Sequence, residues 1–90
     1  MNKNGLIDAI ATQLSKSKDG TEAFINTFID VVSAEIARGN RVQLTGFGTF
    51  ERRLQTAREG RNPRTGESLQ IPAKYHPVFK AGKAFKDLCN

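Results

Sequence analysis

A ten-residue stretch near the middle of the chain limits the possible folds most, because it cannot contribute to a core. Residues 58–67 read REGRNPRTGE, with three arginines, two glycines and one proline but no large apolar side chain. We expect Gly60 and Gly66 to adopt backbone angles closed to other residues, and Pro63 to preset φ for a turn. Strand-like sequence on both sides predicts a β-hairpin. Such a hairpin either moves freely in solvent or lies on a partner, and its cations favour a polyanion.

The rest of the chain is too small to be stable through hydrophobic burial alone. It has 90 residues, 38% of them hydrophobic, and the region from about 51 to 75 adds little to a core. We predict one domain over residues 1–90, and domains with so small a core usually need a disulfide, a metal or a second subunit. Cys89 is the single cysteine, which excludes an internal disulfide and a multi-thiolate zinc site. Oligomerisation is the remaining option.

The positive charge is concentrated in the second half of the chain. Of the net charge of +5, residues 1–40 hold four bases and five acids, residues 41–79 seven bases and three acids, and residues 80–90 three lysines and one aspartate. A near-neutral body with a basic ribbon and C-terminus is typical of a nucleic-acid-binding face. Ordinary surface solubility is the alternative explanation.

The sequence shows neither a signal peptide nor a membrane-spanning segment. Its start lacks a basic region followed by a long apolar run, and no apolar stretch approaches the roughly 18–20 residues of a membrane span. A lone cysteine also fits a reducing compartment. We therefore expect a cytoplasmic protein without a membrane partner.

Two helices are expected in the first forty residues. Asn2 can cap the first, which runs to about Leu14 with apolar residues at helical spacing. Ser17 or Asp19 caps the second, which ends at Gly39, a suitable residue for a left-handed turn. The second helix carries a broad apolar band that includes Phe24, Phe28, Val32 and Ile36. That band indicates burial against a second copy of the chain, although a fully internal helix has the same pattern.

Extended segments follow the helices. We expect strands at 41–45 and 49–54, separated by a tight turn at 46–48, and a returning strand that includes Leu69, Ile71, Pro72 and Ala73. Pro72 and Pro77 should lie on an edge strand or at a bend, because neither can donate to a ladder. A short helix should occupy 83–88, after Gly82. Phe47, at the centre of the tight turn, either packs within its own subunit or inserts into a partner.

Nothing in the sequence supports an enzyme. The single histidine, His76, has no cysteine or clustered carboxylates near it in the sequence, and Cys89 lies one residue from the end. The glycine-containing segments match neither a phosphate-binding loop nor a dinucleotide fingerprint. We expect no catalytic residue, metal, cofactor or small-molecule substrate.

The hairpin is long enough to follow a DNA groove. Strands rise about 3.3 Å per residue, so ten residues a side project about 30 Å. Pro63 at its tip is a rigid apolar side chain with arginines on both sides, whereas a simple turn proline needs no such flanks. Proteins that enter the minor groove insert apolar wedges of this kind between base steps and kink the duplex.

Four segments carry a resemblance to a known family. They are Gly46-Phe47-Gly48-Thr49-Phe50, Gly60-Arg61-Asn62-Pro63-x-Thr65-Gly66, Ile71-Pro72-Ala73 and Pro77-x-Phe79-x-x-Gly82-Lys83. Together with the opening Met1-Asn2-Lys3 and Leu6-Ile7-Asp8, they resemble the HU/IHF family of bacterial DNA-bending proteins, which belong to the minor-groove class, over essentially the whole chain.

The resemblance implies an α+β fold and an intertwined homodimer. It places a helical dimerisation base at 1–40, a three-stranded antiparallel sheet at 41–82 and a C-terminal helix at 83–90. A long β-ribbon arm projects from the sheet at about 52–75. The residues implied to form the dimer core are Phe28, Val32, Leu44, Phe47, Phe50 and Phe79.

The resemblance also implies which residues contact DNA. Pro63 matches the intercalating proline, and Asn62 lies beside it in the groove. The other implied DNA-binding residues are basic: Lys3, Arg53, Arg58, Arg61, Arg64, Lys74, Lys80, Lys83 and Lys86. The implied function is DNA bending and compaction in the nucleoid with little sequence preference. The alternatives are a site-specific bender of the IHF type, and a basic interaction module that binds RNA or an acidic protein.

Some positions depart from the family pattern. Gly5 replaces a polar helix former, so a capping box from Asn2 is absent and we expect the first helix to fray. Gln55 and Gln70 occupy arm positions that are often basic, which should lower the number of phosphate contacts. Leu54 and Tyr75 make the root of the arm more apolar than is usual.

Overall fold

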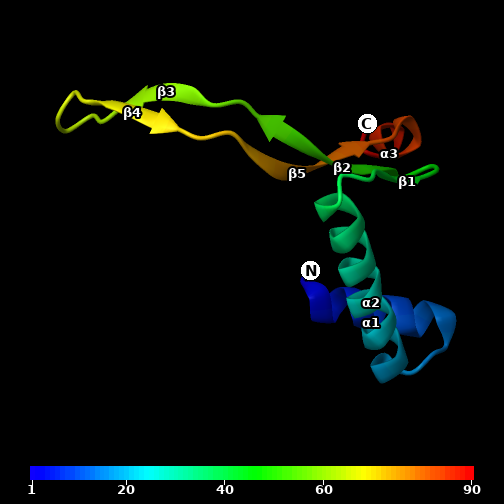
Figure 1. Cartoon of the computed structure of the whole chain (residues 1–90). Coiled ribbons are helices and arrows are strands. Elements are labelled where there is room, and N and C mark those ends of the chain that lie inside the picture. The colour runs from blue at the N-terminus through cyan, green and yellow to red at the C-terminus, as the bar shows by residue number, and fades with distance from the viewer. The chain divides into compact units, whose positions relative to one another are not determined.

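The computed structural model describes residues 1–90 and contains helices at both ends with strands between them (Figure 1). The elements in chain order are α1 (Lys3–Leu14), α2 (Lys18–Ala37), β1 (Val42–Leu44), β2 (Gly48–Gln55), β3 (Arg58–Arg61), β4 (Ser68–Ile71), β5 (Lys74–Ala81) and α3 (Lys83–Leu88). The predicted α+β class, with two helices, an antiparallel sheet, an arm and a short last helix, is confirmed. Two compact units, Met1–Ala34 and Glu35–Asn90, divide the chain. No helix is both long and apolar enough to span a bilayer.

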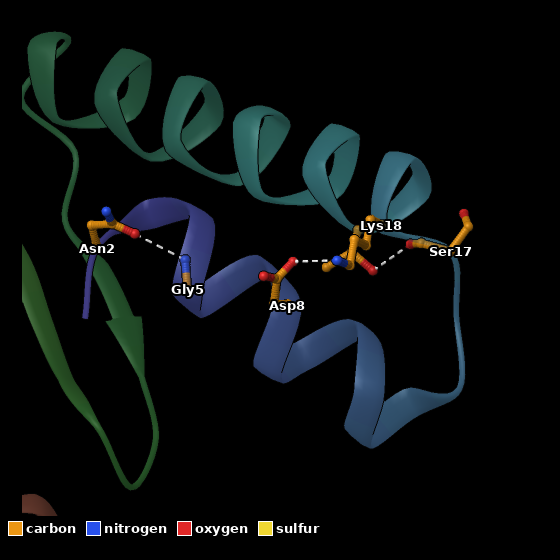
Figure 2. Close-up of polar contacts among 6 residues, drawn as sticks. Asn2, Gly5, Asp8, Ser17 and Lys18 are labelled. Atoms are coloured by element: carbon orange, nitrogen blue, oxygen red, sulfur yellow. Dashed lines mark hydrogen bonds and ion pairs between the residues drawn. The ribbon is translucent and has the colours of Figure 1, made fainter.

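Side-chain caps begin both helices of the first unit (Figure 2). The Asn2 carboxamide oxygen accepts the Gly5 amide at 2.9 Å, so α1 is capped although the reciprocal half of a capping box is missing. The Ser17 hydroxyl accepts the Gly20 amide at 3.1 Å, and Ser17 rather than Asp19 therefore caps α2. An exposed ion pair of 3.3 Å joins Asp8 to Lys18.

The end of α2 belongs to the second unit, and Gly39 terminates it as the sequence predicts. Gly39 has a φ of +90°, and its amide donates to the Ile36 carbonyl at 2.9 Å. The Asn40 amide donates to the Glu35 carbonyl at 3.0 Å. This left-handed turn satisfies carbonyls that the helix leaves free at its C-terminus.

The three-stranded sheet has the order β1-β2-β5, and all its pairs are antiparallel. A tight turn between β1 and β2 is present, but at 45–47, one residue earlier than predicted, because Gly48 already pairs within β2. Gly46 has a φ of +83°, and the Phe47 amide donates to the Leu44 carbonyl at 2.9 Å. β5 is an edge strand and carries Pro77, which is the position expected for a residue that cannot donate to a ladder. The prediction that the returning strand includes Pro72 and Ala73 is wrong: these two residues form the break between β4 and β5, because Pro72 cannot donate to a ladder. The break is the kind of position expected for this proline.

Phe47 packs within its own chain. Its ring centroid lies 5.1 Å from that of Phe79 and 5.0 Å from that of Phe85, and Phe79 in turn lies 4.8 Å from Phe50. These separations suit tilted and stacked aromatic pairs. Phe47 nevertheless remains 43% exposed, which leaves room for a further contact.

The arm continues from β2 and β5 as a second, two-stranded sheet, β3–β4 (Figure 1). Its tip turn spans 62–67, and Gly66 has the expected positive φ of 72°. Our expectation for Gly60 is wrong, because this residue lies within β3 and has no positive φ. A β-carbon there would lie 2.9 Å from the Ile71 Cδ1, so Gly60 makes space for a side chain and does not form the turn.

Candidate nucleic-acid interface

The register of β2 with β5 places three cationic side chains on one face of the sheet. Thr49 pairs with Lys80, Arg53 with His76 and Gln55 with Lys74. Side chains alternate between the faces of a sheet, so Arg53, Lys74 and Lys80 share one face. The structure thus places these three predicted DNA-binding residues on one face, although Arg53 is more than twenty positions from Lys74 and Lys80 in the sequence.

The opposite face of the same sheet is apolar. Phe50 pairs with both Val42 and Phe79, and Leu44 pairs with Gly48. By the same alternation, three predicted dimer-core residues, Leu44, Phe50 and Phe79, share this face. One side of the sheet can therefore attract a polyanion while the other buries apolar surface.

An acidic residue that sequence reasoning missed lies among the cations of the first face. The Glu51 carboxylate accepts from the Lys80 ammonium at 2.9 Å and lies 3.8 Å from the Arg41 Nε. The hydrogen bond from Lys80, with the charges of Lys80, Arg41 and Arg53, holds the pKa of Glu51 below its usual value, although partial burial opposes the shift. Part of the Lys80 charge is thus neutralised within the chain. The register that joins these residues cannot be read from the sequence.

Both faces of the arm carry an arginine. Arg58 pairs with Ile71 and Gly60 with Leu69, whereas Arg61 pairs with Ser68. Arg58 therefore shares a face with the apolar side chains of β4, and Arg61 lies on the other face. A ribbon with cations on both faces can contact phosphates on the two walls of a groove.

The tip presents Pro63 to solvent on a hydrogen-bonded turn. The Asn62 carboxamide oxygen accepts the Arg64 amide at 2.9 Å, and the Asn62 carbonyl accepts the Gly66 amide at 2.8 Å. Asn62 and Gly66 thus hold the turn that carries the exposed ring of Pro63 and the exposed side chain of Arg64.

The remaining predicted lysines are exposed on helices. Lys83 and Lys86 are three residues apart on α3, so they lie on one side of that helix. Lys3 is the first residue of α1, in the first unit.

Several predicted dimer-core residues are far from buried in the single chain. Phe28 and Phe79 are each 38% exposed, and Val32, Leu44 and Phe50 are half-buried. Among the hydrophobic side chains, only those of Ile7, Ala11 and Ile36 are buried. Ninety residues with so small a core need another surface to cover these side chains.

Sequence reasoning also missed Arg52. It lies on the face of Phe50 and Leu54, opposite to Arg53, and its guanidinium carbon is 3.8 Å from the centroid of the Tyr75 ring. The alternation of β2 is the signal that could have revealed it, because it places a cation at an otherwise apolar position.

His76 and Cys89 do not belong to a cluster. His76 lies in β5 and is half-buried, and Cys89 is an exposed free thiol after α3. No group of three or more His, Cys, Asp or Glu side chains is arranged to hold a metal ion.

Comparisons with known proteins agree with this geometry. The family described as "Bacterial DNA-binding protein" matches residues 1–90. The chain is 51% identical to DNA-binding protein HU of Lactococcus lactis over 96% of its length and 94% of that protein. It is 50% identical to DNA-binding protein HU of Clostridium pasteurianum over 100% of its length and 99% of that protein.

Solved structures give the same result. An Anabaena HU–DNA cocrystal structure is similar with a TM-score of 0.92 and 42% identity, and the match covers 99% of this chain and 97% of that one. HU from Thermotoga maritima, in a V42I mutant, gives a TM-score of 0.76 at 29% identity, with all of both chains covered.

Proposed function

Because the chain belongs to the HU/IHF family of bacterial DNA-binding proteins, we propose that it binds double-stranded DNA as a homodimer, with little sequence preference, and bends it. The family consists of architectural DNA-binding proteins and not of enzymes. In this proposal the protein works in the cytoplasm, associated with the nucleoid, where it helps to compact DNA.

The observation that carries the proposal is the separation of charge across the β1-β2-β5 sheet. Arg53, Lys74 and Lys80 share one face, and Leu44, Phe50 and Phe79 share the other. The cationic face meets phosphates and releases their counterions, which supplies affinity without reading bases. The apolar face, with the exposed band of α2, packs against a second copy.

The arms supply the bend. Arg58, Arg61 and Arg64 follow the phosphates along the minor groove, and the Pro63 ring at the exposed tip enters a base step and unstacks it. Two copies bring two wedges. Bending the duplex costs energy, and this cost is lower for DNA that is flexible, nicked or already distorted. Such DNA therefore binds best.

Little in the chain can read a sequence. α3 has six residues, and the minor groove offers the arms only a degenerate pattern of donors and acceptors. A site-specific bender of the IHF type would instead need a partner chain and would show sharply different affinities across sequences. Competition by duplex RNA measures whether the arms also accept an A-form helix.

Bending is tested with Pro63→Ala and a short duplex labelled at both ends for fluorescence energy transfer. The wild-type protein should bring the ends together, and Pro63→Ala should bind with much of its affinity but raise the transfer less. Pro72→Ala is the matched control, because it removes an arm proline that is away from the tip. If Pro63→Ala bent the duplex as much as the wild-type protein does, intercalation of Pro63 would not be the cause of the bend.

A further inference from the structure

Arg52 links the root of the arm to the end of α2. Its Nη1 donates to the Ala37 carbonyl at 3.2 Å, while its guanidinium covers the Tyr75 ring at 3.8 Å. Gly39 lies against the same group, since a β-carbon built on it would be 3.0 Å from the Arg52 Nη2. One side chain thus contacts a helix end and both strands at the root of the arm.

The local chemistry favours this arrangement. The residue opposite Arg52 is Pro77, which has no amide to donate, and Arg52 reaches past it to its diagonal neighbour Tyr75. A carbonyl at the C-terminus of a helix attracts a cation, because the helix dipole is negative there. A guanidinium can stack on a ring and donate in its own plane at once, and a lysine ammonium cannot.

The same contacts argue against a phosphate contact. Arg52 lies on the apolar face, whereas Arg53 lies on the face with Lys74 and Lys80. Its charge is directed at a carbonyl and a ring within the chain, and its side chain is half-buried.

We propose that Arg52 is a positioning residue, which clamps the β2–β5 root of the arm to the last turn of α2 and so fixes the direction in which the arm leaves the sheet. Through the arm it limits the angles at which Pro63 meets the duplex. This role rests on the proposed function for its consequence in DNA bending, and its test between two arms rests on the proposed homodimer; the clamp itself is a property of the protein free of DNA.

The clamp is tested first without DNA. In a Cys89→Ser background, a spin label at Gln70→Cys on the arm reports the distance between the two arms of a dimer by electron double resonance. Arg52→Lys, which keeps the charge, and Tyr75→Ala, which removes the ring, should each broaden the distance distribution. Tyr75→Phe keeps the ring and should leave the distribution narrow.

Binding and bending are then measured with the native Gln70. Arg52→Lys should leave the salt dependence of DNA affinity unchanged. The same variant should broaden the distribution of energy-transfer values measured on the end-labelled duplex. Tyr75→Phe should match the wild type in both measurements. A phosphate contact predicts the reverse: Arg52→Ala would lower the slope of log affinity against log salt by about 0.9 for each phosphate lost, and Arg52→Lys would be neutral.

Two outcomes overturn the proposal. The first is a lower salt slope in Arg52→Ala together with a neutral Arg52→Lys, as a phosphate contact predicts. The second is a lower melting temperature in Arg52→Lys and Tyr75→Ala with an unchanged distance distribution. That second result would mean that Arg52 contributes to stability alone. If the wild-type protein failed to bind or bend DNA, the proposed function would fail, but the distances in the free protein would still decide the clamp.

Discussion

At the scale of single residues, two glycines that are two positions apart are required for different reasons. A β-carbon on Gly48 would lie 2.5 Å from both the Lys80 carbonyl oxygen and the Phe79 ring, so this position needs space. Gly46 has no atom within 4 Å of its would-be β-carbon but has a φ of +83°, so it needs conformational freedom.

Alanine at the two positions should therefore have different costs. Gly48→Ala forces β2 away from the backbone of β5 and should lower the free energy of unfolding by about 3 kcal/mol. Gly46→Ala should cost about 1–2 kcal/mol, the penalty of a left-handed backbone. Urea denaturation of both variants measures the difference, and equal losses would contradict the close approach at Gly48.

Glu51 makes stability depend on pH. Its pKa in the folded chain lies below the ordinary value of 4.5, mainly because of the hydrogen bond from Lys80. The stability that Glu51 contributes is therefore fully present above about that value and is lost as the pH falls through the lower, folded-state pKa. Glu51→Gln should be less stable than the wild type at neutral pH, and the two should converge on acidification. Urea midpoints across pH test this, and a gap that persisted in acid would contradict it.

At the scale of elements, the sequence predicts much of the fold because its local signals are strong. Apolar spacing and capping residues mark α1 and α2, and Gly46 and Gly66 mark turns. Gly60 misleads because a glycine can also serve to admit a neighbouring side chain, here Ile71. Whether a glycine makes room for a side chain in this way depends on strand pairing, and the residues around Gly60 do not reveal how β3 pairs with β4.

The candidate site was less predictable than the fold. Which cations share a face follows from the register of β2 with β5, and a shift of one residue would reverse it. The ion pair of Glu51 with Lys80 and the contact of the Arg52 guanidinium with the Tyr75 ring both join residues more than twenty positions apart. Residue types and local periodicity do not predict which residues so far apart in the sequence will be in contact.

The arm should be dispensable for folding. None of residues 56–73 is buried, and the ladder of β2 with β5 ends at Gln55 and Lys74. Replacing 56–73 by an Asn-Gly turn, which suits a two-residue hairpin, should leave the melting temperature close to that of the wild type. Circular dichroism checks this, and a large drop would mean that the arm stabilises the body.

At the scale of the whole molecule, the exposed apolar surface favours association with a second subunit. Phe28 is 38% and Val31 56% exposed on α2, and such surface is unfavourable in water. The melting temperature should therefore rise with protein concentration. Phe28→Ser should shift sedimentation toward the monomer, whereas Asp30→Asn, on the other side of α2, should not. A wild-type chain that sedimented as a monomer at all concentrations would contradict the homodimer.

The most direct measurement compares DNA affinity across a salt series for the wild-type protein and the variant that lacks 56–73. We predict that log affinity of the wild type falls linearly and steeply with log salt, with a slope of about −0.9 for each phosphate neutralised. The armless variant should bind more weakly and with a shallower slope, because the arginines of the arm are gone. Identical slopes, or a wild-type protein that ignores duplex DNA even at low salt, would contradict a cationic arm that holds the duplex.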